Sequence, residues 1–285
     1  MNDVPRAATV LTHARPQQTA HSLALLRSAA LDAGIVLRFD AEETRKHGLT
    51  PEEGVLLDAP ILDDVDVCIV LGGDGTILRG LRRYAGTSVP VFAVNFGEIG
   101  FLATIDPEGC EEGFRRAFSG DFEVMTLPAI AVETPDGDHA AINDLSIHRR
   151  VGERVAVLAY GVGLEDVGSV RCDGLVIATP AGSTGYNLAN GGPVMAWGVE
   201  GYAVSFIAPH SLSSRPLVVA PDDVLSVHNR SRSAVEIAVD GRPAGFVGPG
   251  ETIMARFVRE AAELAQLPGS SFYHRLREKF GRLAS

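Results

Sequence analysis

The pattern of apolar residues changes near residue 125, and this change restricts the chain to an architecture of two different parts. Before that point, short apolar segments alternate with segments whose apolar residues recur at helical spacing. Beyond it, apolar segments of strand length follow one another, with turns such as Asp240-Gly241 between them. Alternating strands and helices predict an open, mostly parallel sheet, whereas successive strands predict a β-rich domain. We therefore expect an α/β domain over residues 1–124, a β-rich domain over 125–268, and a C-terminal helix over 269–285 that packs on the first domain.

Individual segments follow from the same periodicity. In the first part we expect strands at 8–13, 35–39, 65–71 and 89–95, helices at 17–33 and 76–84, and a polar connection over 42–53. In the second part we expect a short helix near Tyr186 and strands over 129–133, 139–147, 155–161, 175–179, 202–207, 224–228, 234–239 and 252–257. A helix over 271–282 ends the chain.

Charge and composition exclude several classes of protein. The formal net charge of −11 argues against a nucleic-acid binder, because phosphate backbones are bound by an excess of Lys and Arg. It does not exclude a phosphorylated ligand, since a few local amides and arginines bind phosphate well. No apolar run reaches the ~20 residues of a membrane helix. The amino terminus shows no secretory pattern, so we expect a cytoplasmic protein, in which Cys68, Cys110 and Cys172 stay reduced.

One glycine-rich string carries the strongest chemical signal. Gly72-Gly73-Asp74-Gly75-Thr76 lies between a predicted buried strand and a predicted helix. Glycines let the backbone approach a bound group closely, and amides at a helix start bind anions, so Gly72, Gly73, Gly75 and Thr76 are predicted to form a phosphate-donor loop. Phosphate oxygens repel a neighbouring carboxylate, so Asp74 is expected there only if it binds a metal ion or removes a proton from a substrate. The alternative is a tight turn in which Asp74 or Thr76 only caps the helix.

Two further strings complete the pattern. Residues 179–193 read Thr-Pro-Ala-Gly-Ser-Thr-Gly-Tyr-Asn-Leu-Ala-Asn-Gly-Gly-Pro, with hydroxyls, an aromatic ring and small residues that let a flat ligand approach. Ser183 or Thr184 could also cap the following helix. Asn143-Asp144 offers an amide beside a carboxylate, a pair that binds sugar hydroxyls but is also common in ordinary turns.

With these three strings in this order, the chain resembles the NAD kinase family. The glycine string matches the family's first motif, and residues 95–102, Asn-Phe-Gly-Glu-Ile-Gly-Phe-Leu, look like the segment after it. Residues 171–174, Arg-Cys-Asp-Gly, are similar to the family's approach to the second loop, and residues 275–280 resemble its basic tail. The first motif alone also occurs in lipid kinases, so the combination carries the resemblance.

The resemblance implies an α/β domain, a β-rich domain and a substrate cleft between them. It implies that Asp74 is the general base for the 2′-hydroxyl of the adenosine ribose, and that Arg79 and Arg171 could meet phosphates. The NAD contacts that it implies are Asp74, Gly75, Arg79, Phe101, Asn143, Asp144, Arg154, Arg171, Asp173, Thr184, Gly185, Tyr186, Ala189 and Arg242.

The sequence departs from the family pattern at three positions. Ala181 and Gly185 stand where the family usually has threonine and alanine, and Ala189 stands where serine is common. Two hydroxyls are thereby lost, which affects donor preference and affinity but leaves the proposed base in place.

The expected reaction is phosphoryl transfer from ATP or polyphosphate to NAD. We expect a divalent cation, Mg²⁺ or another, that is bound mainly through the donor phosphates and has no dedicated protein ligands. The resemblance implies a homo-oligomer, a dimer or tetramer, and the charge and composition predict that it binds neither nucleic acid nor membrane. Two alternatives stay open: a lipid kinase that shares the first motif, and a non-catalytic NAD-binding regulator.

Overall fold

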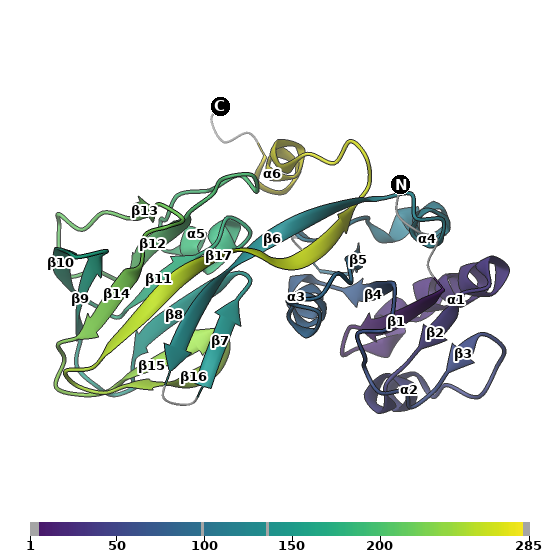
Figure 1. Ribbon diagram of the computed structural model, residues 1–285, viewed down its shortest axis with the longest axis horizontal. Helices are drawn as coiled ribbons and strands as arrows, with labels where there is room; N and C mark the ends of the chain where they lie inside the picture. Colours follow the sequence, from purple (N-terminus) through teal and green to yellow (C-terminus); the bar gives the residue numbers. More distant parts are fainter. Residues whose placement is uncertain (1–5, 98–99, 135–136, 282–285) are drawn as a thin grey trace. The chain divides into compact units, whose positions relative to one another are not determined.

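The computed structural model describes residues 6–97, 100–134 and 137–281 (Figure 1). It forms two compact units: unit 1 contains Met1–Thr126 and Ala262–Ser285, and unit 2 contains Leu127–Ala261. The chain returns to unit 1 before the predicted position 269, because the last part of strand β17 (Thr252–Gln266) pairs in parallel with the sheet of unit 1. Parts of the predicted strings, Glu98 with Ile99 and the end of the tail helix at Arg282, lie outside the described residues.

Unit 1 is built on a parallel sheet, as the alternating pattern predicts. Its strand order is β5-β4-β1-β2-β3, and every neighbouring pair is parallel. The central strands are buried along their whole length, which explains their nearly continuous apolar sequence. The strands are β1 (Ala7–Thr12), β2 (Val36–Arg38), β3 (Val55–Leu56), β4 (Val67–Gly72) and β5 (Val91–Asn95).

Helices cover both faces of this sheet. Helices α1 (Pro16–Ala33) and α4 (Cys110–Phe118) pack on each other and share a core with alternate residues of the strands. Helix α3 (Asp74–Arg83) covers the other face, where the Tyr84 hydroxyl at its end donates to Thr9 Oγ1 of β1 at 2.7 Å (Figure 1). Helix α4 follows a short 3-10 helix (Pro107–Gly109) and was not predicted.

The predicted polar connection over residues 42–53 is wrong in its first part. Helix α2 (Ala41–His47) occupies it and begins at Asp40, whose side chain accepts a hydrogen bond from the Glu43 backbone N–H at 2.8 Å. Glu43 is fully buried. The helix has no apolar periodicity from which it could be predicted, because the side chain that α2 buries in the protein interior is a carboxylate.

Unit 2 is β-rich and contains two sheets that share one hydrophobic core. One sheet has the antiparallel order β13-β12-β11-β8-β15-β16. The other contains β10, β9, β14 and the first part of β17, and β6 pairs with β17 on one side and with β7 on the other. The strands are β6 (Glu123–Thr134), β7 (Gly137–Ala141), β8 (Asp144–Arg149), β9 (Ala156–Val162), β10 (Glu165–Cys172), β11 (Gly174–Ala178), β12 (Tyr202–Ile207), β13 (Leu217–Val219), β14 (Leu225–Asn229), β15 (Val235–Val239) and β16 (Arg242–Val247).

The single strand predicted over residues 139–147 is two strands in the structure. Strand β7 ends at Ala141 and β8 begins at Asp144. Between them, the backbone N–H groups of Ile142 and Asn143 donate to the Asp240 carboxylate instead of to a neighbouring strand. A side chain from a distant turn therefore interrupts the ladder, an effect that local periodicity does not reveal.

Candidate active site

A pocket in unit 1 lies where the strand order reverses. From β1 the chain builds outward through β2 and β3, and it then returns to place β4 and β5 on the other side of β1. Ligands of open α/β sheets bind at such a point, beyond the carboxyl ends of the strands. Here β1 ends at Thr12 and β4 ends at Gly72. The pocket of about 340 Å³ at these ends is lined by Thr12, His13, Ala14, Glu42, Gly73, Asp74, Gly75, Thr76 and Arg79.

The predicted phosphate-donor loop turns from β4 into α3 at this pocket. Gly73 is the N-cap of α3, and no side chain caps the helix, so the predicted capping role of Asp74 or Thr76 is wrong. The first amides of α3 thus lack a side-chain acceptor of the kind that a cap supplies. A Cβ at Gly72 would lie 2.5 Å from the Thr76 Cβ, whereas a Cβ at Gly75 would meet open space. Glycine is therefore a packing requirement at position 72, and position 75 leaves room for a ligand.

Asp74 is a half-buried carboxylate surrounded by backbone amides. Leu102 N–H donates to Asp74 Oδ1 at 3.3 Å, and the N–H groups of Gly100 and Phe101 also bind the carboxylate. Burial raises the pKa of Asp74 above its ordinary value, and this effect outweighs the amides and Lys279, which lower it. A carboxylate with raised proton affinity that lines a phosphate-type pocket is suited to general-base chemistry.

Arg79 is held at the pocket by a buried carboxylate that sequence reasoning missed. Arg79 Nη2 lies 2.7 Å from Glu43 Oε1 and 3.2 Å from the Thr12 carbonyl oxygen. Glu43 also accepts from the Thr12 hydroxyl at 2.7 Å and pairs with Lys46 at 2.7 Å. The buried Arg79 Nε has no partner in the described part of the chain. Asp40, a helix-capping residue three positions before Glu43, was the available sequence signal for α2.

Phe101 occupies a different environment from the predicted one. Its ring is buried and packs on Phe272 and Phe280 of helix α6 (Phe272–Phe280), with ring centroids 6.2 and 5.5 Å apart. Its backbone N–H, in contrast, faces Asp74. Contact between the Phe101 ring and NAD stays a prediction.

In unit 2, Asn143 and Asp144 lie together at the start of β8. Burial, and then the nearby Asp240 carboxylate, raise the pKa of Asp144 to about 7. The buried Asn143 Oδ1 has no hydrogen-bond partner among the described residues. An unpaired buried acceptor is costly unless a ligand or water satisfies it, so this pair is poised to bind a polar group.

Asp240 is the residue of this cluster that sequence reasoning missed. It accepts from the backbone N–H groups of Ile142, Asn143 and Asp144, at 3.2, 2.7 and 3.2 Å. Its φ of 46° lies in the left-handed region. The sequence predicts Asp240-Gly241 only as a turn, and it holds no signal for the long-range contact.

The predicted second loop folds directly onto the same strand junction. Thr179 Oγ1 donates to the Ile142 carbonyl at 2.6 Å and accepts from the Gly182 N–H at 3.1 Å. A Cβ at Gly182 would lie 2.0 Å from the Asn143 carbonyl oxygen, so only glycine fits there. Ser183 Oγ donates to the Pro180 carbonyl oxygen at 2.7 Å, and it does not cap the helix as predicted.

The short helix α5 (Tyr186–Ala189) carries the exposed residues of this loop. Thr184, which was also a predicted cap, donates to the Ala181 carbonyl oxygen at 3.4 Å instead. The Tyr186 ring stacks on His148 with centroids 5.7 Å apart, and Gly185, Tyr186 and Ala189 are exposed. The pKa of Tyr186 is raised by burial and by Asp144, so the ring lies near the carboxylate. The structure thus groups the predicted residues Asn143, Asp144, Thr184, Gly185 and Tyr186 around one strand junction.

The remaining predicted residues of unit 2 lie elsewhere. Asp173 pairs with Arg149 at 2.6 Å, and this hydrogen bond lowers the pKa of Asp173. Arg154 and Arg171 line a second pocket of about 530 Å³ together with Arg230 and Arg232, and this pocket does not include Asn143, Asp144 or Tyr186. Arg242 is exposed at the start of β16. The contacts of these residues with NAD stay predictions.

Other findings bear on the expected ligands. Among the described residues, no three His, Cys, Asp or Glu side chains lie close enough to form a metal site. All three cysteines are free and buried, as expected. None of the helices in the described ranges has the length and apolar character needed to cross a bilayer.

One domain is doubly wound and carries a phosphate-type loop with a half-buried carboxylate, and the other is β-rich and presents an unpaired amide oxygen beside a carboxyl group of raised pKa. Together these features are those of a nucleotide-binding kinase. The model of the ATP-NAD kinase N-terminal domain matches residues 33–122, and that of the C-terminal domain matches residues 142–267. The chain therefore belongs to the NAD kinase family and is an enzyme of the kinase class.

Individual relatives agree with this assignment. The NAD kinase of Gemmatimonas aurantiaca is 36% identical over 88% of this chain and 89% of its own length. That of Symbiobacterium thermophilum is 33% identical over 97% of this chain and 99% of its own length. Among solved structures, an NAD kinase from Archaeoglobus fulgidus in complex with ATP has a TM-score of 0.74 and 26% identity, covering 97% of both chains. Yeast NADH kinase complexed with NADH has the same fold, with a TM-score of 0.87 at 21% identity over 100% of this chain and 90% of the other.

Proposed function

We propose that the enzyme transfers a phosphoryl group from ATP or polyphosphate to the 2′-hydroxyl of the adenosine ribose of NAD, giving NADP. The observation that carries the proposal is the position of Asp74: a carboxylate with a raised pKa that lines the pocket formed by the glycine loop at the switch point of the sheet. The family's relatives named NAD kinase support NAD as the acceptor.

In this mechanism Asp74 acts as the general base. Its ionised oxygen takes the proton from the ribose hydroxyl while the ribose oxygen forms a bond to the terminal phosphorus of the donor. The bond between that phosphorus and the bridging oxygen breaks, and ADP or shortened polyphosphate leaves. The amides of Gly100, Phe101 and Leu102 hold the carboxylate in place without taking the proton-accepting role from it.

The donor phosphates are assigned to the glycine loop and to Arg79. The amides at the start of α3 and the positive end of the helix dipole attract phosphate oxygens. Arg79 lines the same pocket, and Glu43 fixes its direction. Charge neutralisation and alignment are the main sources of rate enhancement in phosphoryl transfer.

A divalent cation, Mg²⁺ in our proposal, enters with the donor. The residues fit such an ion, because the pocket offers the carboxylates of Asp74 and Glu42 beside the space for phosphates and no complete cage of protein ligands among the described residues. The cation would supply charge neutralisation of the phosphate oxygens when it is bound.

Recognition of NAD is assigned to the cluster in unit 2. The unpaired Asn143 Oδ1, the Asp144 carboxyl and the exposed Tyr186 ring offer an acceptor, a titratable oxygen and a flat surface. These groups complement a nucleoside, whose base stacks and whose hydroxyls and amino groups donate hydrogen bonds. We further propose that the enzyme is a cytoplasmic homo-oligomer.

The direct test is incubation of the purified chain with NAD, ATP and Mg²⁺, followed by chromatographic detection of NADP. Polyphosphate replaces ATP in one parallel reaction, NADH replaces NAD in a second, and diacylglycerol or sphingosine in a third. Formation of NADP supports the proposal. Phosphorylation of a lipid alone, or NAD binding without any phosphorylated product, would contradict it.

A further inference from the structure

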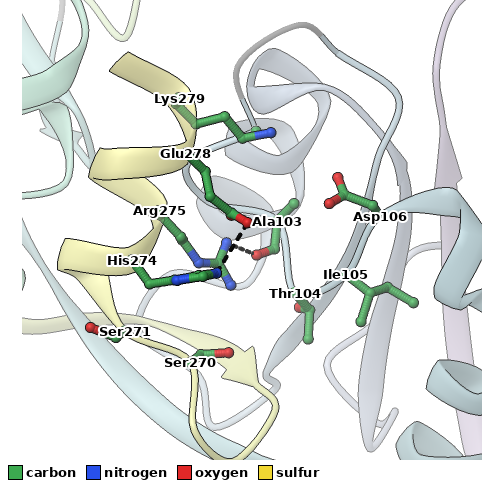
Figure 2. Close-up of a pocket in the computed structure, with 11 residues that line it drawn as sticks. Ala103, Thr104, Ile105, Asp106, Ser270, Ser271, His274, Arg275, Glu278 and Lys279 are labelled. Carbon is green, nitrogen blue, oxygen red and sulfur yellow. Dashed lines mark hydrogen bonds and ion pairs between the residues drawn. The ribbon is translucent and has the colours of Figure 1, made fainter. Parts of the chain in front are cut away.

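Helix α6 contacts the loop that surrounds the proposed base. Figure 2 shows Arg275 reaching from α6 toward Ala103, on the side of the loop that faces the helix. Arg275 Nη1 donates to the carbonyl oxygen of Phe101 at 3.2 Å and to that of Ala103, and Nη2 donates to Gln266 Oε1. All these residues belong to unit 1.

The two sides of this loop serve different partners. The N–H groups of Gly100, Phe101 and Leu102 bind the Asp74 carboxylate, while the carbonyl groups of Phe101 and Ala103 bind the Arg275 guanidinium. Gly100 has a φ of 65°, and consecutive amides around a left-handed residue form a concave site for an anion. The Phe101 carbonyl belongs to the same peptide group as the Leu102 N–H, so its contact with the planar guanidinium fork orients the peptide whose N–H donates to Asp74. The contact with the Ala103 carbonyl holds the next part of the loop.

The helix is anchored at the same place by aromatic packing. The Phe101 ring lies against Phe272 and Phe280, one on each end of α6. Arg275 is between them in sequence and partly buried, and burial lowers its pKa while Asp106, Glu278 and Asp74 raise it. Burial of a guanidinium costs free energy, and here its hydrogen bonds to two carbonyl groups of one loop offset that cost. These bonds also fix the geometry of the loop.

We propose that Arg275 is a positioning residue for the phosphoryl transfer: through the peptide groups of residues 101–103 it holds the amides that orient Asp74. The inference rests on the proposed role of Asp74 as the base. It assigns to the C-terminal helix a part in catalysis, which Arg275 plays from outside the lining of the glycine-loop pocket.

The test compares Arg275→Ala and Arg275→Lys with Arg277→Ala, a control on an exposed residue of the same helix. We expect Arg275→Ala to lower kcat about 10-fold or more, because the orientation of the base is lost. The KM values for NAD and for ATP should change less than about threefold, because the substrate contacts persist. Arg275→Lys should fall between the wild type and the alanine variant, since it keeps the charge without the fork. Arg277→Ala should retain the wild-type kcat.

The pH profile separates positioning from general loss of structure. An ionised base makes kcat fall as the pH drops through its pKa. Removing Arg275 removes a cation and loosens the amides, both of which lower the pKa of Asp74, so the acid limb should move to higher pH in Arg275→Ala. The charged or titratable groups that line the pocket with Asp74 or act on its pKa are His13, Glu42, Arg79 and Lys279, and those that face Arg275 are Asp106 and Glu278. All of them remain in every variant.

Each result decides between the two roles. If Arg275→Ala shows the wild-type kcat, or loses kcat with an unmoved acid limb, the positioning role is wrong. If the alanine variant does not fold, a lysine variant that folds with wild-type kcat and pH profile overturns the role equally. In an Asp74→Asn background, Arg275→Ala should lower kcat less than twofold further. An active Asp74→Asn enzyme refutes the proposed base as well as the positioning role, whereas an inactive Asp74→Asn with a normal Arg275→Ala refutes only the latter.

Discussion

The carboxylate of Asp240 accepts a hydrogen bond from the backbone N–H of Asn143, with 2.7 Å between the oxygen and the nitrogen. The same carboxylate also binds the N–H groups on either side of Asn143, and so it determines the backbone between β7 and β8. Asn143 and Asp144, the proposed NAD-binding pair, are therefore placed by a residue nearly one hundred positions away.

Asp240→Ala should weaken NAD binding more than it changes kcat. The substitution leaves three backbone N–H groups without their acceptor, and each buried unsatisfied donor costs roughly 1–3 kcal/mol. We expect the Kd for NAD, measured by calorimetry, to rise about 10-fold or more. Asp240→Asn is the matched control, because asparagine keeps an acceptor and tolerates the left-handed backbone. Unchanged affinity in the alanine variant would show that Asp240 does not organise the site.

Asp74→Asn should lower kcat by about 10² to 10⁴, the usual contribution of a positioned base. The side chain keeps its size and can still accept from the Leu102 N–H, so the fold should survive. Stopped assays of NADP formation, with circular dichroism as the structural check, give the result. Near-normal turnover in a folded variant would refute the role of Asp74.

Gly182→Ala and Gly185→Ala form a matched pair within the second loop. A Cβ at Gly182 would lie 2.0 Å from the Asn143 carbonyl oxygen, whereas at Gly185 the nearest atom is 3.4 Å away and φ is −95°. We expect Gly182→Ala to lower the free energy of unfolding by about 1–3 kcal/mol and to weaken NAD binding. Gly185→Ala should leave the free energy of unfolding within about 0.5 kcal/mol of the wild type. Denaturant titration measures the difference, and equal effects of the two substitutions would contradict the packing argument.

Glu43→Gln should destabilise the protein, and Glu42→Gln should not. Glu43 is buried and pairs with Arg79 and Lys46, so its neutralisation leaves partly buried cations without their counter-charge, at a cost of about 3 kcal/mol. Glu42 is an exposed residue, 3.7 Å from Arg79, and its loss should cost less than about 1 kcal/mol. Because Glu43 orients Arg79, we also expect Glu43→Gln to raise the KM for ATP. A wild-type KM in a folded Glu43→Gln variant would exclude that role.

The raised pKa of Asp144 predicts a specific pH dependence of stability. In the folded protein this carboxyl titrates near 7, against an ordinary value of 3.8, so between these pH values the folded state holds a proton that the unfolded state has lost. Stability from this group is therefore complete below about pH 4 and is lost as the pH rises toward 7. Relative to Asp144→Asn, the wild type should lose up to about 1.4 kcal/mol of unfolding free energy per pH unit in this window. Parallel pH dependences of the two proteins, measured by urea denaturation, would contradict the raised pKa.

Local patterns were sufficient for the parts of this protein that are governed by neighbours in sequence. Buried parallel strands need continuous apolar runs, and a glycine-rich turn into a helix needs residues without side chains, so β4, the loop at Gly72 and α3 were predictable. The division into an α/β part and a β-rich part follows from the same periodicities. Residue types also identified Asp74 and Asn143 as chemically unusual in their surroundings.

Only the tertiary structure decided which distant residues support those groups. The supporting residues are charged and lie in segments with no distinctive pattern. They are Glu43, which binds Arg79, Asp240, which binds the Asn143 backbone, and Arg275, which binds the loop around Asp74. A buried charge is stable only where its particular partners meet it, and that meeting depends on the packing of elements far apart in the chain. Periodicity predicts which face of an element is buried, but it does not predict which polar group from a distant element contacts that face.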